Sequence, residues 1–128
     1  MSKRRVLVVD DTRTSLFLLK QLLQNGGYEV ETASDGWEAL DMVPEFQPDL
    51  VLLDVMMPGL DGIECCRRIR ETEGYSDIRI MMVTALGEMD RIQEAFAAGC
   101  DDYVSKPVDR AELDRKVKEL LRFLPSSA

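Results

Sequence analysis

Three aspartates, one threonine and one lysine are the residues of this 128-residue chain that could act together on a phosphoryl group. They are Asp10, Asp11, Asp54, Thr84 and Lys106. Carboxylates a few ångströms apart repel one another and raise each other's pKa unless a cation lies among them. Mg²⁺ suits such a site, because proteins typically hold it with one or two carboxylates, waters and phosphate oxygens. With Lys106 and Thr84 to position the phosphoryl oxygens, Asp54 could act as the nucleophile and form an acyl phosphate.

These residues follow apolar segments that predict the strands of a parallel sheet. Continuous apolar runs, typical of strands buried on both faces, occupy residues 6–9, 50–53 and 78–84, and weaker strands are predicted at residues 28–33 and 102–105. Between them, apolar residues spaced three to four apart predict helices, with Trp37 anchoring the second. The alternation predicts an α/β protein: a (βα)₅ doubly wound, five-stranded parallel sheet with helices on both faces.

A strand order of 2-1-3-4-5, the flavodoxin-like arrangement, would bring the polar residues onto one rim of the sheet. The first, third, fourth and fifth strands are then successive neighbours at roughly 5 Å spacing. Each residue alone also has an ordinary explanation: Asp10 and Asp11 as a helix cap, Asp54 as an acceptor for loop amides, Thr84 as a strand residue and Lys106 as a solvated side chain. Their joint position at the ends of four strands favours a shared site.

Composition excludes several classes of function. The net charge is −8, which disfavours direct binding to nucleic acid or to anionic lipid surfaces. There is no histidine, so this chain has no histidine nucleophile, general base or zinc ligand of its own. Cys65, Cys66 and Cys100 match no disulfide or CxxC pattern and are predicted to be buried thiols in a reducing compartment. No apolar run approaches the roughly 20 residues of a membrane span, so we expect a cytoplasmic location without membrane insertion.

Five motifs give the sequence a specific resemblance. They are Val8-Val9-Asp10-Asp11, Asp54-Val55-Met56-Met57-Pro58-Gly59-Leu60-Asp61-Gly62, Val83-Thr84-Ala85, Ala98-Gly99-Cys100-Asp101-Asp102-Tyr103 and Val104-Ser105-Lys106-Pro107. Together they resemble the receiver domain of two-component response regulators, over residues 4 to about 123. The resemblance implies that Asp54 accepts a phosphoryl group from a phosphohistidine on a separate protein. That partner would be a sensor histidine kinase or a histidine phosphotransfer protein.

The resemblance also assigns the Mg²⁺ ligands. It implies that Asp11 and Asp54 bind the metal directly, that the backbone carbonyl of Met56 is a third ligand, and that Asp10 acts through the metal's water shell. For the phosphoryl oxygens it implies three donors, which are the Thr84 hydroxyl, the Ala85 backbone N–H and the Lys106 ammonium. The Lys106-Pro107 peptide matches a position that is cis in the family.

A switch follows from the same resemblance. Thr84 is expected to move towards the phosphoryl group while Tyr103 rotates inward, which changes the surface of the fourth helix, fifth strand and fifth helix and controls a downstream effector protein. Charged residues of that surface are Glu88, Asp90, Arg91, Glu94, Asp109, Arg110, Glu112 and Arg115, a pattern equally typical of a solvated face. On the first helix, Arg13, Leu16 and Lys20 resemble the docking site for the histidine-bearing partner.

Met56 and Leu86 are apolar where members of the family often carry polar side chains near the attacking water. We hypothesise that they disfavour an ordered hydrolytic water and prolong the life of the phosphorylated form. The chain is thus expected to catalyse its own Mg²⁺-dependent phosphorylation and slow dephosphorylation, and not to be a turnover enzyme. Three alternatives are a phosphorelay intermediate, a small-molecule phosphatase that uses Asp54, and a constitutive interaction module. The expected domains are a receiver domain at residues 1–124 and a tail or linker at residues 125–128.

Overall fold

The computed structural model describes residues 3–122 and 124 and alternates strands with helices along the chain. The strands are β1 (Arg5–Val9), β2 (Glu29–Ala33), β3 (Leu50–Asp54), β4 (Arg79–Thr84) and β5 (Asp102–Ser105). The α-helices are α1 (Arg13–Asn25), α2 (Gly36–Phe46), α3 (Gly62–Glu71), α4 (Ile92–Ala98) and α5 (Arg110–Leu121), and a short 3₁₀ helix, η1 (Met89–Arg91), precedes α4. The predicted succession of five strand–helix units is therefore confirmed.

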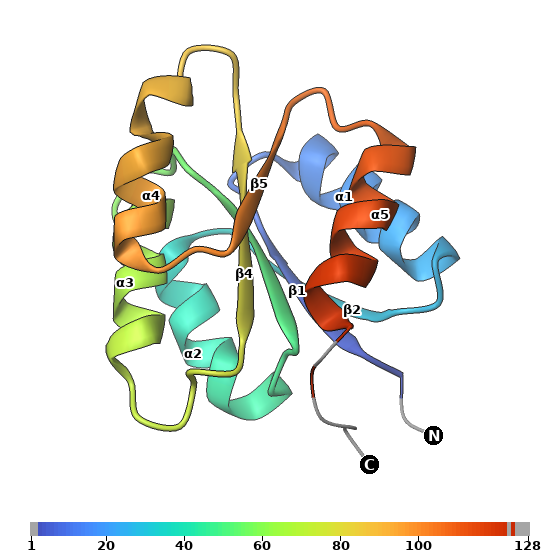
Figure 1. Ribbon diagram of the computed structural model, residues 1–128, viewed down its shortest axis with the longest axis horizontal. Coiled ribbons are helices and arrows are strands. Elements are labelled where there is room, and N and C mark those ends of the chain that lie inside the picture. Colours follow the sequence, from blue (N-terminus) through green and yellow to red (C-terminus); the bar gives the residue numbers. More distant parts are fainter. Residues whose placement is uncertain (1–2, 123, 125–128) are drawn as a thin grey trace.

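The strands form one parallel sheet in the order β2-β1-β3-β4-β5, as predicted. Helices α2, α3 and α4 cover one face of this sheet, and α1 and α5 cover the other (Figure 1). The carboxyl ends of all five strands point to the same edge, since every pairing is parallel. The fold is the flavodoxin-like doubly wound arrangement, in which ligands bind at that edge.

Both faces of the sheet are buried, which explains the continuous apolar runs in the sequence. Alternate strand residues such as Leu7, Leu53 and Met82 join the core beneath α2, α3 and α4. Their neighbours, among them Val8 and Leu52, join a second core beneath α1 and α5. A strand that is covered on both sides needs apolar residues at every position and not at every second one. The sheet is therefore a rigid support for the residues that follow its strands.

Two expectations about the elements need correction. Strands β2 and β4 begin one residue later than predicted, and β3 includes Asp54, the residue expected to follow it. Trp37 does not anchor α2, because its side chain is 52% exposed. The ring lies on the surface with the guanidinium of Arg68 5.0 Å from its centre. The buried residues of α2 are instead Gly36, Ala39 and Val43, so the core-facing side of the helix is rotated from the one that Trp37 marks.

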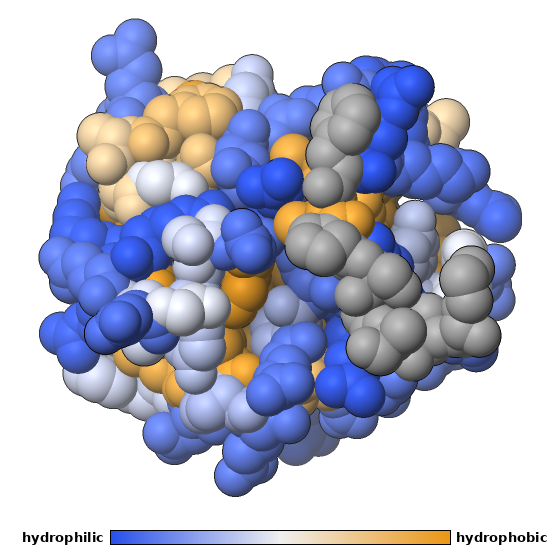
Figure 2. Space-filling view, turned by 60° about the horizontal axis from the view of Figure 1, so that its bottom comes forward, coloured by the Kyte–Doolittle hydropathy of each residue, from blue (hydrophilic) through white to orange (hydrophobic). Residues whose placement is uncertain are grey.

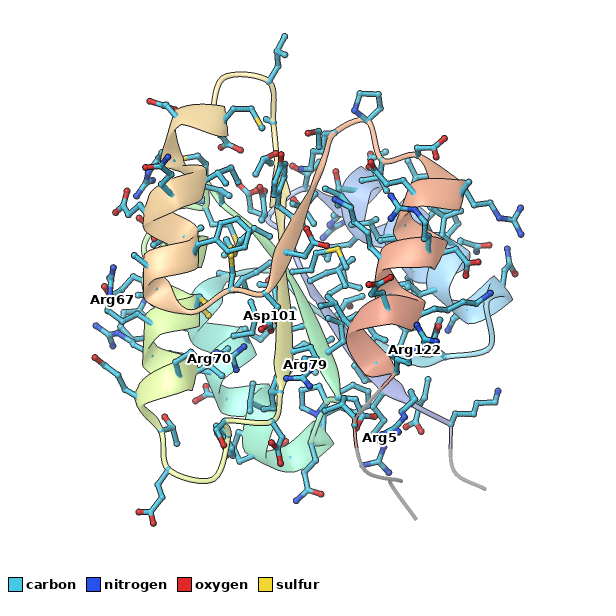
Figure 3. The ribbon with its side chains drawn as sticks, viewed as in Figure 1. Arg5, Arg67, Arg70, Arg79, Asp101 and Arg122 are labelled. Atoms are coloured by element: carbon cyan, nitrogen blue, oxygen red, sulfur yellow. The ribbon has the colours of Figure 1, made fainter. Side chains whose placement is uncertain are left out.

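Arg70 braces the strand ends opposite the polar rim. Its guanidinium lies 2.8 Å from an Asp101 carboxylate oxygen and donates to the backbone carbonyls of Gly99 and Ile78 (Figure 3). The same Asp101 oxygen accepts the Ile80 N–H at 2.8 Å. The brace therefore connects the end of α3 to the starts of β4 and β5.

Hydrophilic side chains cover most of the face seen in Figure 2, with apolar patches between them. Such a mixture is ordinary for a folded protein surface.

Among the described residues, no helix is both long enough and apolar enough to cross a membrane. The cytoplasmic location expected from the sequence stays a prediction, as does the domain boundary after residue 124, because residues 125–128 lie outside the described part of the chain.

Gly62 provides a test of how closely α3 must approach β3. A Cβ atom at this position would overlap the carbonyl oxygen of Asp54 and lie 2.9 Å from its carbonyl carbon. We expect Gly62→Ala to lower the free energy of unfolding by about 3 kcal/mol, because backbone and not a flexible side chain must move. Urea denaturation measures the change. Gly87→Ala is the matched control, since a Cβ there meets nothing within 4 Å; equal stability of the two variants would contradict the prediction.

Candidate functional site

The strand ends bring three carboxylates together at the rim of the sheet. Asp10 and Asp11 directly follow β1, and Asp54 ends β3, the strand that pairs with β1. Each of the three offers a carboxylate oxygen, and these oxygens all lie within 4.8 Å of one another. Asp10 is fully buried and Asp54 is 5% exposed, whereas Asp11 is exposed. The site is thus open to solvent on one side and dry on the other.

Lys106 supplies the positive charge of the cluster. Its Nζ lies 2.9 Å from Oδ2 of Asp10 and 3.6 Å from Oδ2 of Asp54. Burial disfavours the ammonium, but the hydrogen bond to Asp10 and the charges of both aspartates outweigh that effect and raise the pKa of Lys106. The backbone N–H of Lys106 donates to the Thr84 carbonyl at 2.7 Å, and the Lys106-Pro107 peptide is cis. Lys106 therefore follows β5, and its backbone hydrogen bond ties it to the end of β4.

Asp54 is the carboxyl group that this cluster perturbs most clearly. Burial, followed by the charge of Asp10, raises the pKa of Asp54 from 3.8 to about 7, although Lys106 opposes the shift. One ammonium does not neutralise three carboxylates. The site therefore favours either a proton or a cation beside Asp54.

A hard divalent cation fits this donor set. Asp10, Asp11 and Asp54 present carboxylate oxygens close enough to be shared, and oxygen is the ligand that Mg²⁺ prefers. The Asp10 carboxylate is also committed to the local backbone, since its Oδ1 accepts the Thr12 N–H at 2.9 Å. Asp10 is thus tied into the turn before α1 as well as the cluster. It does not cap the helix as considered from the sequence, because the N-cap residue of α1 is Thr12, without a side-chain cap hydrogen bond.

Thr84 and Ala85 lie at the end of the neighbouring strand β4. The Thr84 side chain is fully buried, and its hydroxyl makes only long contacts, 3.4 Å to the Val104 carbonyl and 3.5 Å to the Met89 sulfur. The backbone N–H of Ala85 donates to Oε1 of Glu88 at 2.7 Å. Glu88 was expected on an outer surface, but its carboxylate instead turns back towards the rim. No sequence signal indicated this, because the orientation depends on the loop after β4.

Tyr103 on the edge strand β5 contacts two helices. Its ring packs edge-on against Phe96 of α4, with centroids 6.4 Å apart. Lys116 of α5 places its Nζ 5.0 Å from the ring centre and donates to the Tyr103 carbonyl at 2.6 Å. The ring is half-buried in this arrangement. Lys116 was not singled out in the sequence, where it was one of many charged residues of an amphipathic helix.

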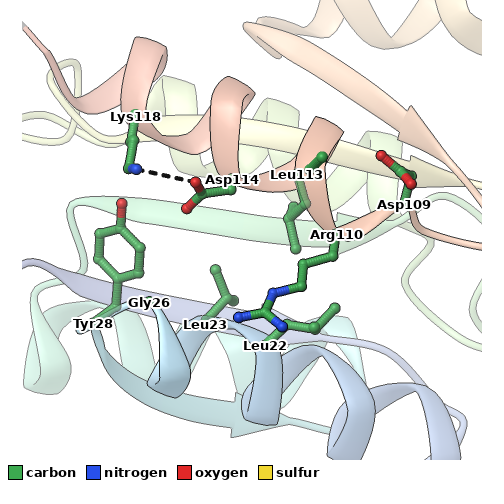
Figure 4. A pocket seen from close by; sticks show the side chains of 10 residues that line it. Leu22, Leu23, Gly26, Tyr28, Asp109, Arg110, Leu113, Asp114 and Lys118 are labelled. Carbon is green, nitrogen blue, oxygen red and sulfur yellow. Dashed lines mark ion pairs between the residues drawn. The ribbon is translucent and has the colours of Figure 1, made fainter.

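One groove lies away from the carboxylates. It has a volume of about 570 Å³ between α1 and α5, beside Tyr28 and the ion pair of Lys118 with Asp114 (Figure 4). Burial raises the pKa of Tyr28. None of Asp10, Asp11, Asp54, Thr84 or Lys106 lines this groove. The candidate chemistry therefore belongs to the rim of the sheet and not to this groove.

The three cysteines are buried and remote from this chemistry. Burial raises the pKa of the Cys65 and Cys100 thiols to about 12 and that of Cys66 to about 11. Thiols with such values are poor nucleophiles and poor metal ligands at neutral pH. Their role is packing, as expected.

Comparison with known families identifies the arrangement. The profile of the response regulator receiver domain matches residues 6–118, which include every carboxylate, hydroxyl and amine described above. The chain belongs to the response regulator receiver domain family. Receiver domains are signalling switches of two-component systems and not turnover enzymes.

Individual relatives agree with this assignment. The chain is 45% identical over 118 residues to the response regulator MprA of a Mycobacterium species, covering 92% of the chain and 50% of the relative. It is 39% identical over 118 residues to the DNA-binding dual master transcriptional regulator RpaA of Synechocystis, covering 92% of the chain and 49% of the relative. The chain thus spans about half the length of these relatives.

Solved receiver structures have the same fold. The chemotaxis protein CheY4 of Vibrio cholerae superposes with a TM-score of 0.88 at 32% identity, covering 94% of this chain and 100% of that one. A CheY-like receiver domain protein of Methanospirillum hungatei gives a TM-score of 0.87 at 32% identity, covering 94% and 95%. Each match extends over 94% of this receiver domain chain.

The pKa of Asp54 predicts an unusual pH dependence for the metal-free receiver domain. Because the folded state holds a proton on Asp54 up to about pH 7 and the unfolded state releases it near 3.8, stability falls as pH rises through that interval. Asp54→Asn removes the penalty. We expect it to raise the free energy of unfolding by about 1–3 kcal/mol at about pH 8 and to change it little at about pH 4.

Chemical denaturation in a metal chelator at several pH values measures this difference. Asp41→Asn, which neutralises an exposed carboxylate on α2, is the control and should give no pH-dependent gain. If the free energy of unfolding of Asp54→Asn depends on pH in the same way as that of the wild type, the neighbours of Asp54 do not raise its pKa and the prediction is wrong.

Proposed function

We propose that this receiver domain accepts a phosphoryl group on Asp54 from a partner phosphohistidine and thereby switches its interaction with a downstream effector protein. The observation that carries the proposal is the placement of Asp54. Its carboxylate is nearly buried at the end of β3, with an ammonium 3.6 Å away and two further carboxylates close by. A carboxylate so positioned could act as a nucleophile, with the Lys106 ammonium already beside it.

The residues around Asp54 would divide the work of the transfer. An Asp54 oxygen forms a bond to phosphorus while the bond from phosphorus to the histidine nitrogen breaks, and the imidazole leaves with that electron pair. The Lys106 ammonium, the Thr84 hydroxyl and the Ala85 N–H are the donors proposed for the phosphoryl oxygens. All three come from the ends of β4 and β5, which the register Thr84 to Ser105 holds side by side. The 128 residues contain no histidine, which is in keeping with the proposed supply of the phosphorylated imidazole by a partner.

Mg²⁺ is the cofactor proposed for the acidic cluster. Asp11 and Asp54 would be direct ligands together with the Met56 backbone carbonyl, and Asp10 would act through bound water. When bound, the ion neutralises the negative charge that accumulates between the carboxylates and the phosphoryl oxygens. The like-charge repulsion at Asp54 supports this assignment, because a dication removes it more completely than Lys106 alone.

An apolar groove beside the site supports the proposed docking of the histidine-bearing partner on α1. The groove has a volume of about 430 Å³, and Leu18, Leu22 and Val108 line it together with Lys106 and Pro107. Leu18 is 55% exposed and its neighbour Phe17 61%. A helix packed there would lie next to Lys106, whose ammonium group is beside Asp54. Arg13, Leu16 and Lys20 would form the polar and apolar border of the same surface.

The output surface is proposed to be α4, β5 and α5. Tyr103 supports it, because its ring touches Phe96 of α4 and the Lys116 ammonium of α5. Movement of Thr84 towards a phosphoryl group would free space beneath Tyr103 and change both contacts.

A phosphorelay intermediate would use the same site with a second histidine protein as acceptor. A small-molecule phosphatase is less well supported, because its acid–base aspartate two residues after the nucleophile is replaced by Met56.

Acetyl phosphate tests the assignment of Asp54 directly. The carboxylate oxygen bonds to phosphorus, the phosphorus–oxygen bond to acetate breaks, and acetate leaves with the electron pair. Intact mass spectrometry after incubation with Mg²⁺ should show a single adduct that hydroxylamine removes. Asp54→Asn and a metal-chelated sample are the controls and should show none. An adduct that persists in Asp54→Asn would contradict the proposed acceptor, and rapid donor consumption without adduct would favour the phosphatase.

The lifetime of the adduct tests the proposed role of Met56 and Leu86. Their side chains are 53% and 91% exposed beside the rim, where they offer no hydrogen bond to an attacking water. We expect Met56→Asn combined with Leu86→Lys to shorten the half-life of the phosphorylated form by about tenfold, since polar groups there can order a water. Phosphate release after removal of the donor gives the rate. Phe17→Ser, an exposed change on α1, is the control, and an unchanged or longer half-life would refute the hypothesis.

A further inference from the structure

We propose that Glu88 is an internal competitor for the phosphoryl group, because its carboxylate occupies the Ala85 amide that the phosphoryl group needs. The inference rests on the proposed function of Asp54 and concerns the regulation of that same site. It makes Glu88 a positioning residue whose departure must accompany phosphorylation.

The hydrogen bond in question is short and charge-assisted. Oε1 of Glu88 accepts the Ala85 N–H at 2.7 Å, and the Glu88 N–H donates back to the Ala85 carbonyl at 3.0 Å. Hydrogen bonds to a carboxylate are stronger than those between neutral groups. A backbone amide has one hydrogen to donate, so Ala85 cannot serve Glu88 and a phosphoryl oxygen with full strength at the same time.

The other proposed donors have no comparable competitor. Among the described residues, the Thr84 hydroxyl contacts the Val104 carbonyl and the Met89 sulfur, neither of which carries a charge. Lys106 is bonded to Asp10 and Asp54, which belong to the site and stay beside the phosphoryl group. Apart from the acidic cluster of Asp10, Asp11 and Asp54, Glu88 is thus the one described acidic side chain that is hydrogen-bonded to a proposed phosphoryl donor.

Charge adds to the competition for the hydrogen bond. Glu88 contributes to the raised pKa of Asp54, which indicates that its negative charge acts on this carboxyl group. A phosphoryl group on Asp54 carries more negative charge than the carboxylate it replaces, so the repulsion from Glu88 grows on phosphorylation. A carboxylate and a phosphoryl oxygen are similar acceptors, and their like charges prevent both from occupying the same donor.

Release of Glu88 would also move the chain that leads into α4. Glu88 immediately precedes η1, and its carbonyl accepts the Arg91 N–H at 3.0 Å. The Arg91 guanidinium in turn lies 3.6 Å from Asp61 and 3.3 Å from the Met56 sulfur, on the loop after β3. Departure of the carboxylate from Ala85 therefore links the state of the site to the position of this turn.

Substitution of Glu88 tests the proposal with acetyl phosphate as the donor. We expect Glu88→Ala to raise the initial rate of Asp54 phosphorylation about tenfold at constant Mg²⁺ and ionic strength, because a charge-assisted hydrogen bond is no longer displaced. Glu88→Gln, which keeps an acceptor oxygen but loses the charge, should raise it by a smaller factor. Asp90→Asn removes the same charge from the same exposed turn without touching Ala85 and is the matched control.

Calorimetric titration with beryllofluoride, a stable phosphoryl analogue, gives a second readout that does not depend on turnover of the donor. Affinity should follow the same order, with Glu88→Ala tightest, then Glu88→Gln, then the wild type and Asp90→Asn. Urea denaturation establishes that each variant is folded. A structural cap alone would lower stability without changing the rate or the affinity.

Several results would overturn the inference. Wild-type rates in both Glu88 variants, slower phosphorylation of either, or an equal gain in Asp90→Asn would each contradict competition by Glu88. Absence of an adduct on the wild type and on all variants would instead contradict the proposed function of Asp54. The two failures are thus distinguishable within one set of experiments.

Discussion

The repulsion among three carboxylates at one rim of the sheet is the constraint on which the site depends. Asp10 and Asp54 lie where burial makes each charge costly, and Lys106 is the ammonium that the structure places between them. Because one positive charge is insufficient, Asp54 keeps a pKa near 7 and the cluster has a standing affinity for protons and cations. An unstable arrangement of this kind persists only when the surrounding chain holds it rigidly.

The sheet supplies that rigidity. Strands β1 and β3 are covered on both faces, so neither can shift to relieve the carboxylates without disrupting two separate cores. Gly62 brings the first turn of α3 against the backbone of Asp54, which fixes the end of β3 further. Strand β5 lies at the edge of the sheet, beside β4. The residues proposed to move are Tyr103 on β5 and Thr84 at the end of β4. The central strands β1 and β3 therefore hold the acidic cluster, and the proposed response involves β4 and the edge strand β5.

Much of this could be predicted from the sequence, for a geometrical reason. Parallel strands end at the same edge, so the residues after four apolar runs had to meet once the strand order was correct. The orientation of individual side chains could not be predicted in the same way. Trp37 has the helical spacing of a core residue yet is exposed, because the buried face of α2 runs through Gly36, Ala39 and Val43. Glu88 looks like a surface charge in the sequence, and only the loop after β4 turns it onto the Ala85 amide.

Through Tyr103, a bound effector would act on the proposed phosphorylation site as well as respond to it. Its ring meets Phe96 of α4 and its carbonyl is bonded to Lys116 of α5, so one residue of an edge strand joins helices on opposite faces of the sheet. If Tyr103 is coupled to Asp54 as proposed, an effector that binds the phosphorylated form more tightly stabilises that form by the same coupling free energy. On this proposal an effector on this surface is not only a recipient of the signal but also a determinant of how much phosphorylated receiver is present.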